Sequence, residues 1–235
     1  MRYFGGKQRI SKELTRYLNT HIKDGQPFVD LFCGSCNVIS KINKGRVRVG
    51  NDKHPYLISM WLELQKGMLL PDNITKDEYL HIKENLDENK ALSGFVGFGL
   101  SFGGKWFGGY AKSGERNYCM NAKNSTMRKM KNLEDVTFTN EDYRKVNIPK
   151  GSLVYCDIPY ENVTGYDSGL VGEFNHDEFY KWVDENKHNY DILISEYQEN
   201  VRDNYKIVWS KDSKQDMRNK DNVRKDTTEV LITPK

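Results

Sequence analysis

Seven strand-like segments, with helical patterns between several of them, limit the fold of this chain more than any other feature. They are short apolar, β-branched or aromatic runs at 28–32, 47–51, 136–139, 153–156, 191–195, 206–209 and 229–233. Apolar residues at helical spacing occur at 10–18, 55–64 and 174–183, the last with Asn175 as its expected N-cap. Strands that alternate with helices favour an α/β fold with a largely parallel sheet covered on both faces.

The stretch at 66–132 interrupts this alternation. A charged pattern at 77–89 predicts a helix, and glycines mixed with aromatic residues follow at 94–110, ahead of a basic tract. A composition shift this sharp between two strands indicates an inserted subdomain. We therefore expect a main domain made of 1–65 and 133–235, with the subdomain inserted between them.

Composition narrows the function classes. The chain has 235 residues, enough for one large domain or a domain with an insertion. Its net charge is only +3, so any nucleic-acid surface must come from local clustering of basic residues. No apolar run approaches the ~20 residues of a membrane span, and the first residues lack the apolar core of a signal peptide. We therefore expect a cytoplasmic protein.

The four cysteines are Cys33, Cys36, Cys119 and Cys156. The first two form a C-x-x-C pair, which can serve redox chemistry or metal binding. No second close pair completes a zinc site, and structural disulfides are rare in the cytosol. We expect small side chains in a turn and no bound metal.

The most informative motif is the tetrapeptide Asp157-Ile158-Pro159-Tyr160, which follows the apolar run at 153–156. In open α/β sheets, ligands bind at the carboxyl ends of the strands. The carboxylate and the adjacent backbone carbonyl can accept hydrogen bonds from an exocyclic amine, and the aromatic ring can stack on a planar group. The alternative is an ordinary turn, since Asp and Pro are common turn residues.

Further polar segments accompany other strands. A turn with Gly34 follows the first strand and permits close backbone approach to a ligand, although the G-x-G-x-x-G fingerprint is absent. Asp52, about twenty residues further on, is placed to bind ribose hydroxyls. Lys7 follows a glycine pair and can donate to a carboxylate, and Asp142 is either a ligand contact or a loop acid. The structural alternatives are a plain turn, a helix N-cap at Asp52 and a frayed terminus at Lys7.

Together these motifs resemble the Dam-like, D12 class DNA adenine-N6 methyltransferases, especially phage-encoded members. The matching pieces lie at 3–7, 32–35, 51–52, 101–110 and 155–160, so the resemblance spans nearly the whole chain. It implies a Rossmann-like, S-adenosylmethionine-dependent methyltransferase sheet of seven mostly parallel strands. It also implies that the insertion is a target-recognition subdomain.

The resemblance also implies residue roles. S-adenosylmethionine would be contacted by Tyr3, Lys7, Asp30, Phe32, Gly34, Asp52, Asp142 and Asp157. The catalytic motif would be Asp157, Ile158, Pro159 and Tyr160. Double-stranded DNA would be held by Lys105, Arg116, Asn117, Lys123 and Arg128 in the insertion.

The implied reaction is methyl transfer to N6 of an adenine flipped out of duplex DNA, without a metal. A glycine-bearing loop at 161–173 would close over the base. One departure from the family pattern is Ile158, which stands where a first proline is usual. Its backbone carbonyl is retained, and Pro159 keeps the preceding residue extended, so we expect retained activity.

Three alternatives remain open. Related amino-methyltransferases act on RNA or on glutamine side chains, but they favour Asn where this chain has Asp157. A catalytically silent DNA-binding or cofactor-binding protein is the second alternative, with Ile158 marking the loss. A NAD-linked dehydrogenase is disfavoured by the missing glycine fingerprint. Cytosine-C5 chemistry would use a Pro-Cys dipeptide, which this chain lacks. The recognition sequence and the oligomeric state stay open.

Overall fold

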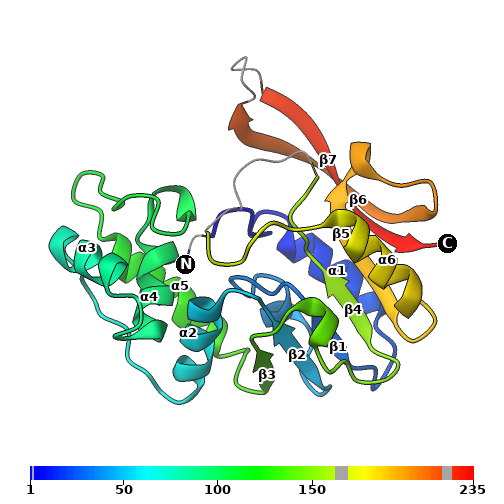
Figure 1. Cartoon of the computed structure of the whole chain (residues 1–235), viewed down its shortest axis with the longest axis horizontal. Helices are drawn as coiled ribbons and strands as arrows, with labels where there is room; N and C mark the ends of the chain where they lie inside the picture. Colours follow the sequence, from blue (N-terminus) through cyan, green and yellow to red (C-terminus); the bar gives the residue numbers. More distant parts are fainter. Residues whose placement is uncertain (2, 162–168, 219–223) are drawn as a thin grey trace.

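The computed structural model describes residues 1, 3–161, 169–218 and 224–235. Seven strands within these ranges form one sheet in the order β3-β2-β1-β4-β5-β7-β6 (Figure 1). They are β1 (Phe28–Asp30), β2 (Arg48–Asn51), β3 (Val136–Thr139), β4 (Leu153–Cys156), β5 (Asp191–Tyr197), β6 (Tyr205–Arg218) and β7 (Arg224–Pro234). The predicted strands and the Rossmann-like fold class are confirmed. The last three strands run further than their apolar runs indicated.

Strand direction determines which residues share an edge of the sheet. The strands β1 to β5 pair in parallel, whereas β7 is antiparallel to both β5 and β6. Asp30 at the end of β1 is in register with Gly50 of β2 and Tyr155 of β4. The strand order reverses at β1, and a crevice at the carboxyl ends is expected at such a switch point.

Helices cover both faces of the sheet, as predicted. Leu14 of α1 (Ser11–His21) and Leu57 of α2 (Pro55–Gln65) are buried with Phe28 on one face. Val183 of α6 (His176–Asn186) is buried with Val29 on the other. Neighbouring residues of β1 thus point to opposite faces, as strand geometry requires.

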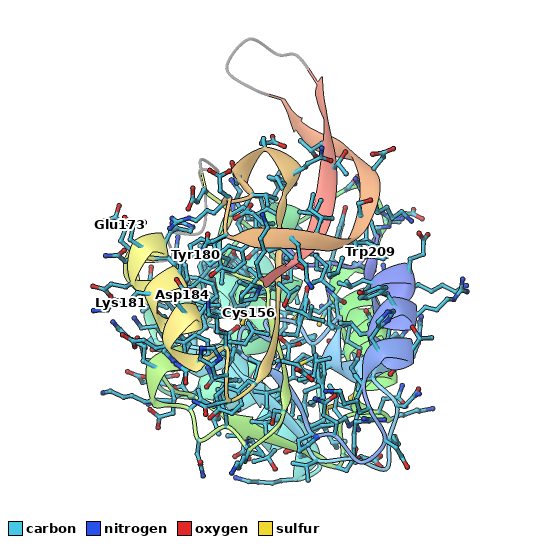
Figure 2. The ribbon with its side chains drawn as sticks, turned by 90° about the vertical axis from the view of Figure 1, so that its right-hand side faces the viewer. Cys156, Glu173, Tyr180, Lys181, Asp184 and Trp209 are labelled. Atoms are coloured by element: carbon cyan, nitrogen blue, oxygen red, sulfur yellow. The ribbon has the colours of Figure 1, made fainter. Side chains whose placement is uncertain are left out.

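Helix α6 shows how this packing is arranged. Asn175 caps it by accepting a hydrogen bond from the Glu178 backbone N–H, 3.1 Å, as expected from the sequence. Figure 2 shows Cys156 of β4 in the interior, while Lys181 and Asp184 lie on the outer side of the helix. The polar residues of α6 therefore face solvent and its apolar residues face the sheet.

The turn after β1 leads to a 3₁₀ turn, η1 (Ile39–Lys41). The charged helix expected at 77–89 is present as α3 (Lys76–Glu84), but it ends earlier than predicted, and a second helix, α4 (Lys90–Gly99), follows it. Asn85 ends the first helix, and Asn89 caps the second by accepting from the Leu92 backbone N–H. Asn prefers such caps to helix interiors, which explains the break.

The inserted stretch packs beside α2 (Figure 1). It contains α3, α4, the turn η2 (Phe102–Gly104) and α5 (Tyr118–Met130). Gly94 of α4 lies so close to α2 that a Cβ atom there would be 2.1 Å from the Tyr56 carbonyl oxygen. Across the described ranges, no helix combines the length and apolar character needed to cross a membrane.

Candidate active site

A cavity of about 1250 Å³ lies at the carboxyl edge of the parallel strands. Its wall includes most of the residues singled out from the sequence: Tyr3, Lys7, Asp30, Phe32, Gly34, Asp52, Asp142, Asp157, Pro159 and Tyr160. The structure therefore brings together segments from the chain start, β1, β2, β3 and β4. The exception is Ile158, whose side chain is buried in the core between the sheet and α6.

One end of the cavity is built around Asp52 and the turn after β1. The Asp52 carboxylate accepts hydrogen bonds from the Gly34 backbone N–H, 2.8 Å, and the His54 N–H, 2.9 Å. Trp61 donates its indole N–H to the Gly34 carbonyl oxygen at 3.1 Å. Gly34 has a φ of +48°, and a Cβ there would lie 3.0 Å from the Tyr3 ring. Burial raises the pKa of Asp52 to about 6.

Asp30 lies deeper in the same wall and is 1% exposed. It accepts backbone hydrogen bonds from Ile39 and Phe32, yet its Oδ1 has no partner among the described residues. Burial, together with the nearby charges of Asp157 and Asp52, holds the pKa of Asp30 well above its ordinary value. A buried polar atom without a partner is costly, so this oxygen fits a polar group of a bound ligand.

The other end of the cavity centres on Asp157. Lys7 Nζ lies 2.6 Å from Asp157 Oδ1, 3.7 Å from Glu229 Oε2 and 4.3 Å from the centre of the Tyr160 ring. The Tyr160 hydroxyl donates to Glu229 Oε2 at 3.3 Å. Burial raises the pKa of Asp157, and Lys7 opposes that rise. Two carboxylates therefore flank one buried ammonium group beside an aromatic ring.

The end of the tetrapeptide and the residue after it are held by α6 and by the connection between β5 and β6. His176 Nε2 lies 2.7 Å from the Pro159 carbonyl oxygen, which can only accept, so the ring donates. Arg202 bridges Glu161 and Asp177, at 2.9 Å to each. The closing loop expected at 161–173 has residues 162–168, including Gly165, outside the described ranges. Its later glycines, Gly169 and Gly172, line the cavity.

Asp142 also lines the cavity, but its carboxylate is already engaged. Arg144 donates from Nε to Asp142 Oδ1 at 2.7 Å and from its terminal nitrogen to Oδ2 at 2.9 Å. This pair lowers the pKa of Asp142. Asp142 therefore stands in the cavity wall as an ion-paired residue.

Two of the five residues expected to hold DNA are engaged within the protein. Asn117 caps α5 and donates to the Asp72 carbonyl oxygen at 3.0 Å. Lys123 pairs with the Asp72 carboxylate at 2.5 Å. Both side chains thus fasten the N-terminal part of α5 to the segment between α2 and α3.

The other three are more available. Lys105 lines the cavity and places its Nζ 4.8 Å from the centre of the Phe4 ring. Arg116 is exposed beside the Tyr118 ring, and Arg128 is exposed on α5. The half-buried Lys129 of α5 donates to the Ser35 carbonyl oxygen at 2.5 Å. Helix α5 is thereby joined to the turn after β1.

The sequence analysis missed Glu229, His176 and His54. Glu229 lies in the middle of β7 and pairs with Tyr197, the last residue of β5, so the antiparallel strand carries it past the edge where the parallel strands end. The antiparallel direction of β7 is therefore the feature from which Glu229 could have been predicted. His176 begins α6, and His54 precedes α2 and accepts from the Leu57 backbone N–H through Nδ1. Both could have been sought as first residues of helices that start at the cavity edge.

The surroundings of the four cysteines indicate that their side chains pack in the protein interior and do not react. All four are free and buried, and burial raises the pKa of Cys33 well above its ordinary value. A thiol in such surroundings stays protonated and unreactive. Among the described residues, no group of three or more His, Cys, Asp or Glu is placed to hold a metal ion.

The sheet order and the antiparallel β7 define a Rossmann-like sheet with a polar cavity at its switch point. The family model of the D12 class N6 adenine-specific DNA methyltransferases matches residues 3–96, which confirms the family resemblance over that segment. The match contains the Lys7, Gly34 and Asp52 motifs.

Solved structures with a similar fold include magnesium protoporphyrin IX methyltransferase from Synechocystis PCC 6803. It is 8% identical, with 97% of this chain and 83% of that chain covered and a TM-score of 0.43. A dimethyladenosine transferase from Plasmodium falciparum is 12% identical, with 95% and 60% covered and a TM-score of 0.37. We draw nothing further from these two likenesses.

Proposed function

We propose that this protein transfers a methyl group from S-adenosylmethionine to N6 of an adenine flipped out of duplex DNA. The observation that carries the proposal is the shared cavity, in which Asp52 and Gly34 at one end face the same space as Asp157 and Tyr160 at the other. The D12 class match over residues 3–96 supports adenine in DNA as the target.

The first end of the cavity fits the cofactor. Asp52 would accept hydrogen bonds from the ribose hydroxyls, and the turn at Gly34 allows close approach of the ligand. The unpartnered Oδ1 of Asp30 and the partly exposed ring of Phe32 complete this wall. S-adenosylmethionine supplies an electrophilic methyl group on a sulfonium centre. Tyr3 and Lys7 connect this end to the tetrapeptide.

The second end fits an exocyclic amine. The lone pair of adenine N6 is delocalised into the ring, which makes the amine a poor nucleophile. The Asp157 carboxylate and the Ile158 carbonyl would accept its two hydrogens and free the lone pair for attack. Attack by the nitrogen would break the bond between the methyl carbon and the sulfonium sulfur, and the cofactor would leave as a neutral thioether. The nitrogen would become positive and lose a proton, and Asp157 would stabilise that charge and accept the proton. The raised pKa of Asp157 suits this acceptor role.

The target base has to leave the helix, because its amine is shielded in a duplex. Tyr160 would stack on the extruded base, a contact worth roughly 1–3 kcal/mol. We assign residues 66–132 to DNA contact, with Lys105, Arg116 and Arg128 reaching phosphates or bases. Asn117 and Lys123 would act mainly by fastening α5 to the segment between α2 and α3.

The test is a methyl-transfer assay with labelled S-adenosylmethionine and duplex DNA, RNA or protein as acceptor, followed by nucleoside analysis. We expect N6-methyladenine in DNA, and sequencing of modified bases would give the sequence context. Transfer to RNA or protein would favour the related amino-methyltransferases. Cofactor binding without any transfer would favour a silent protein and overturn the proposal.

An Asp157→Ala variant provides the internal check. Loss of the acceptor should lower the transfer rate by at least about a hundredfold, the scale seen when one transition-state partner is removed. Cofactor affinity, measured by calorimetry, should fall much less. Near-normal turnover would show that Asp157 does not have this role.

A further inference from the structure

We infer that Glu229 is a positioning residue, which takes the ammonium group of Lys7 away from Asp157 when the substrate amine arrives. The inference rests on the proposed function, because it concerns how that amine reaches Asp157. It adds a residue of β7 to the site. It also gives Lys7 a role that follows from its two carboxylate partners.

The first observation is competition for Asp157. Lys7 Nζ lies 2.6 Å from Asp157 Oδ1, within direct hydrogen-bond distance. The substrate amine needs an oxygen of the same carboxylate. Lys7 is 6% exposed, so it cannot simply turn out to water. Leaving a buried ammonium group without an acceptor is strongly unfavourable. A second carboxylate beside Lys7 would keep the ammonium group paired as it leaves Asp157.

Glu229 is placed to be that acceptor. Its Oε2 is 3.7 Å from Lys7 Nζ. A charge-assisted N–H···O contact is about 2.8 Å long, so a movement of roughly 1 Å would complete the exchange. The Tyr160 ring lies 4.3 Å from Lys7 Nζ and would remain in contact during this movement, as a cation–π partner.

The surroundings hold Glu229 in position. It pairs with Tyr197 across β5 and β7, and the next residues of β7, Val230 and Leu231, are buried in the core. The Tyr160 hydroxyl donates to Glu229 Oε2 at 3.3 Å. The side chain is 16% exposed. Glu229 therefore either serves Lys7, as we infer, or serves only as an acceptor for Tyr160, and the two roles can be separated.

The experiment is a double-mutant cycle between Lys7 and Glu229, read as the single-turnover rate of methyl transfer to DNA. Glu229→Gln keeps the size and the acceptor for Tyr160 but removes the charge. We expect its rate to fall about tenfold or more, as for a buried charge that loses its partner, while the cofactor dissociation constant changes less than about threefold. In a Lys7→Met background the same change should cause no further loss, because no ammonium group is left to move.

Controls separate charge from shape. Glu229→Asp, which keeps the carboxylate, should recover most of the rate lost in Glu229→Gln. Glu63→Gln removes an exposed carboxylate of α2 that pairs with Lys66, and it should leave the rate unchanged. Thermal unfolding of every variant is measured alongside. If Glu229→Gln does not fold, the cycle is run with Glu229→Asp, whose smaller loss should likewise vanish in Lys7→Met.

Two results would overturn the inference. One is an unchanged rate in Glu229→Gln. The other is the same fold-loss in the Lys7 and Lys7→Met backgrounds, which would leave Glu229 as a partner of Tyr160 alone. Absence of DNA methylation by the unmodified protein is a different outcome, and it would remove the proposed function itself.

Discussion

Tyr160 combines two contacts in one side chain. Its ring lies beside the Lys7 ammonium group, and its hydroxyl donates to Glu229. The sequence predicted that this ring stacks on a planar group, and it did not predict the contact with Lys7. The hydroxyl contact could not be foreseen, because Glu229 is far away in the sequence and reaches the site only through the direction of β7.

The two contacts predict different losses. Tyr160→Phe removes one hydrogen bond, with an expected cost of about 0.5–1.5 kcal/mol. Tyr160→Ala also removes the stacking surface, worth roughly 1–3 kcal/mol more for the flipped base. Methylation kinetics with a DNA duplex should therefore show a far larger loss in Tyr160→Ala. Equal losses in the two variants would assign the function to the hydroxyl.

Asp52 predicts a pH dependence. Its pKa is raised to about 6, so the carboxylate is charged above that pH and becomes neutral below it. A neutral carboxyl accepts ribose hydroxyls less strongly, so cofactor affinity should fall as the pH drops through about 6. Calorimetric titration from pH 7.5 to 5, a range chosen to span that pKa, measures this.

The matched control is Asp52→Asn, which cannot ionise. Its cofactor affinity should be weaker at neutral pH and should lose the decline below about 6. Asp30 and Asp157 also have raised pKa values, and both remain in the control. A decline of the same size in Asp52→Asn would assign the effect to them.

At the scale of elements, the apolar runs located the strands well, because a buried strand needs little beyond short apolar segments. The helix boundaries within residues 66–132 were harder to predict from the sequence. Asn85 ends α3 before the predicted end of the charged helix at 89, and Asn89 caps the start of α4. The short η1 turn likewise depends on tertiary packing that periodicity does not reveal.

The contact between α4 and α2 is a critical one. A Cβ at position 94 would lie 2.1 Å from the Tyr56 carbonyl oxygen, which belongs to backbone and cannot easily move. Gly94→Ala should therefore lower the free energy of unfolding by about 1–3 kcal/mol, the cost of overpacking. Thermal or denaturant unfolding measures this.

Lys83→Ala on the exposed side of α3 is the comparison for that variant. A surface change of this kind should stay within about 0.5 kcal/mol of the unmodified protein. If Gly94→Ala were equally harmless, the two helices would have room to separate.

At the scale of the whole molecule, charge is nearly balanced, and the net value is +3. DNA affinity must then come from a few local contacts, and each phosphate contact adds about 0.9 to the slope of log K against log salt. Arg116→Ala and Arg128→Ala should each lower that slope by about one unit. Lys123→Ala should change it little, because Lys123 is paired with Asp72. Fluorescence anisotropy at several salt concentrations distinguishes these outcomes.

The sequence was sufficient for the fold class and for the residues that end parallel strands, such as Asp30 and Asp157. Both follow from local patterns that repeat with each strand. The sequence was insufficient for Glu229, which needs the antiparallel direction of β7, and for the engagement of Lys123 by Asp72. Such pairings depend on tertiary contacts between distant segments, and these contacts cannot be derived from a single sequence.

The close packing of Gly94 against the Tyr56 carbonyl has a practical consequence for exchanging residues 66–132, which we propose to contact DNA, with the same stretch of a related protein. A chimera that grafts only residues 66–132 would place a foreign helix on a host surface shaped for α4. The grafted segment should therefore include the donor's own α2, equivalent to Pro55–Gln65, so that both helices of the α2–α4 contact come from the same protein.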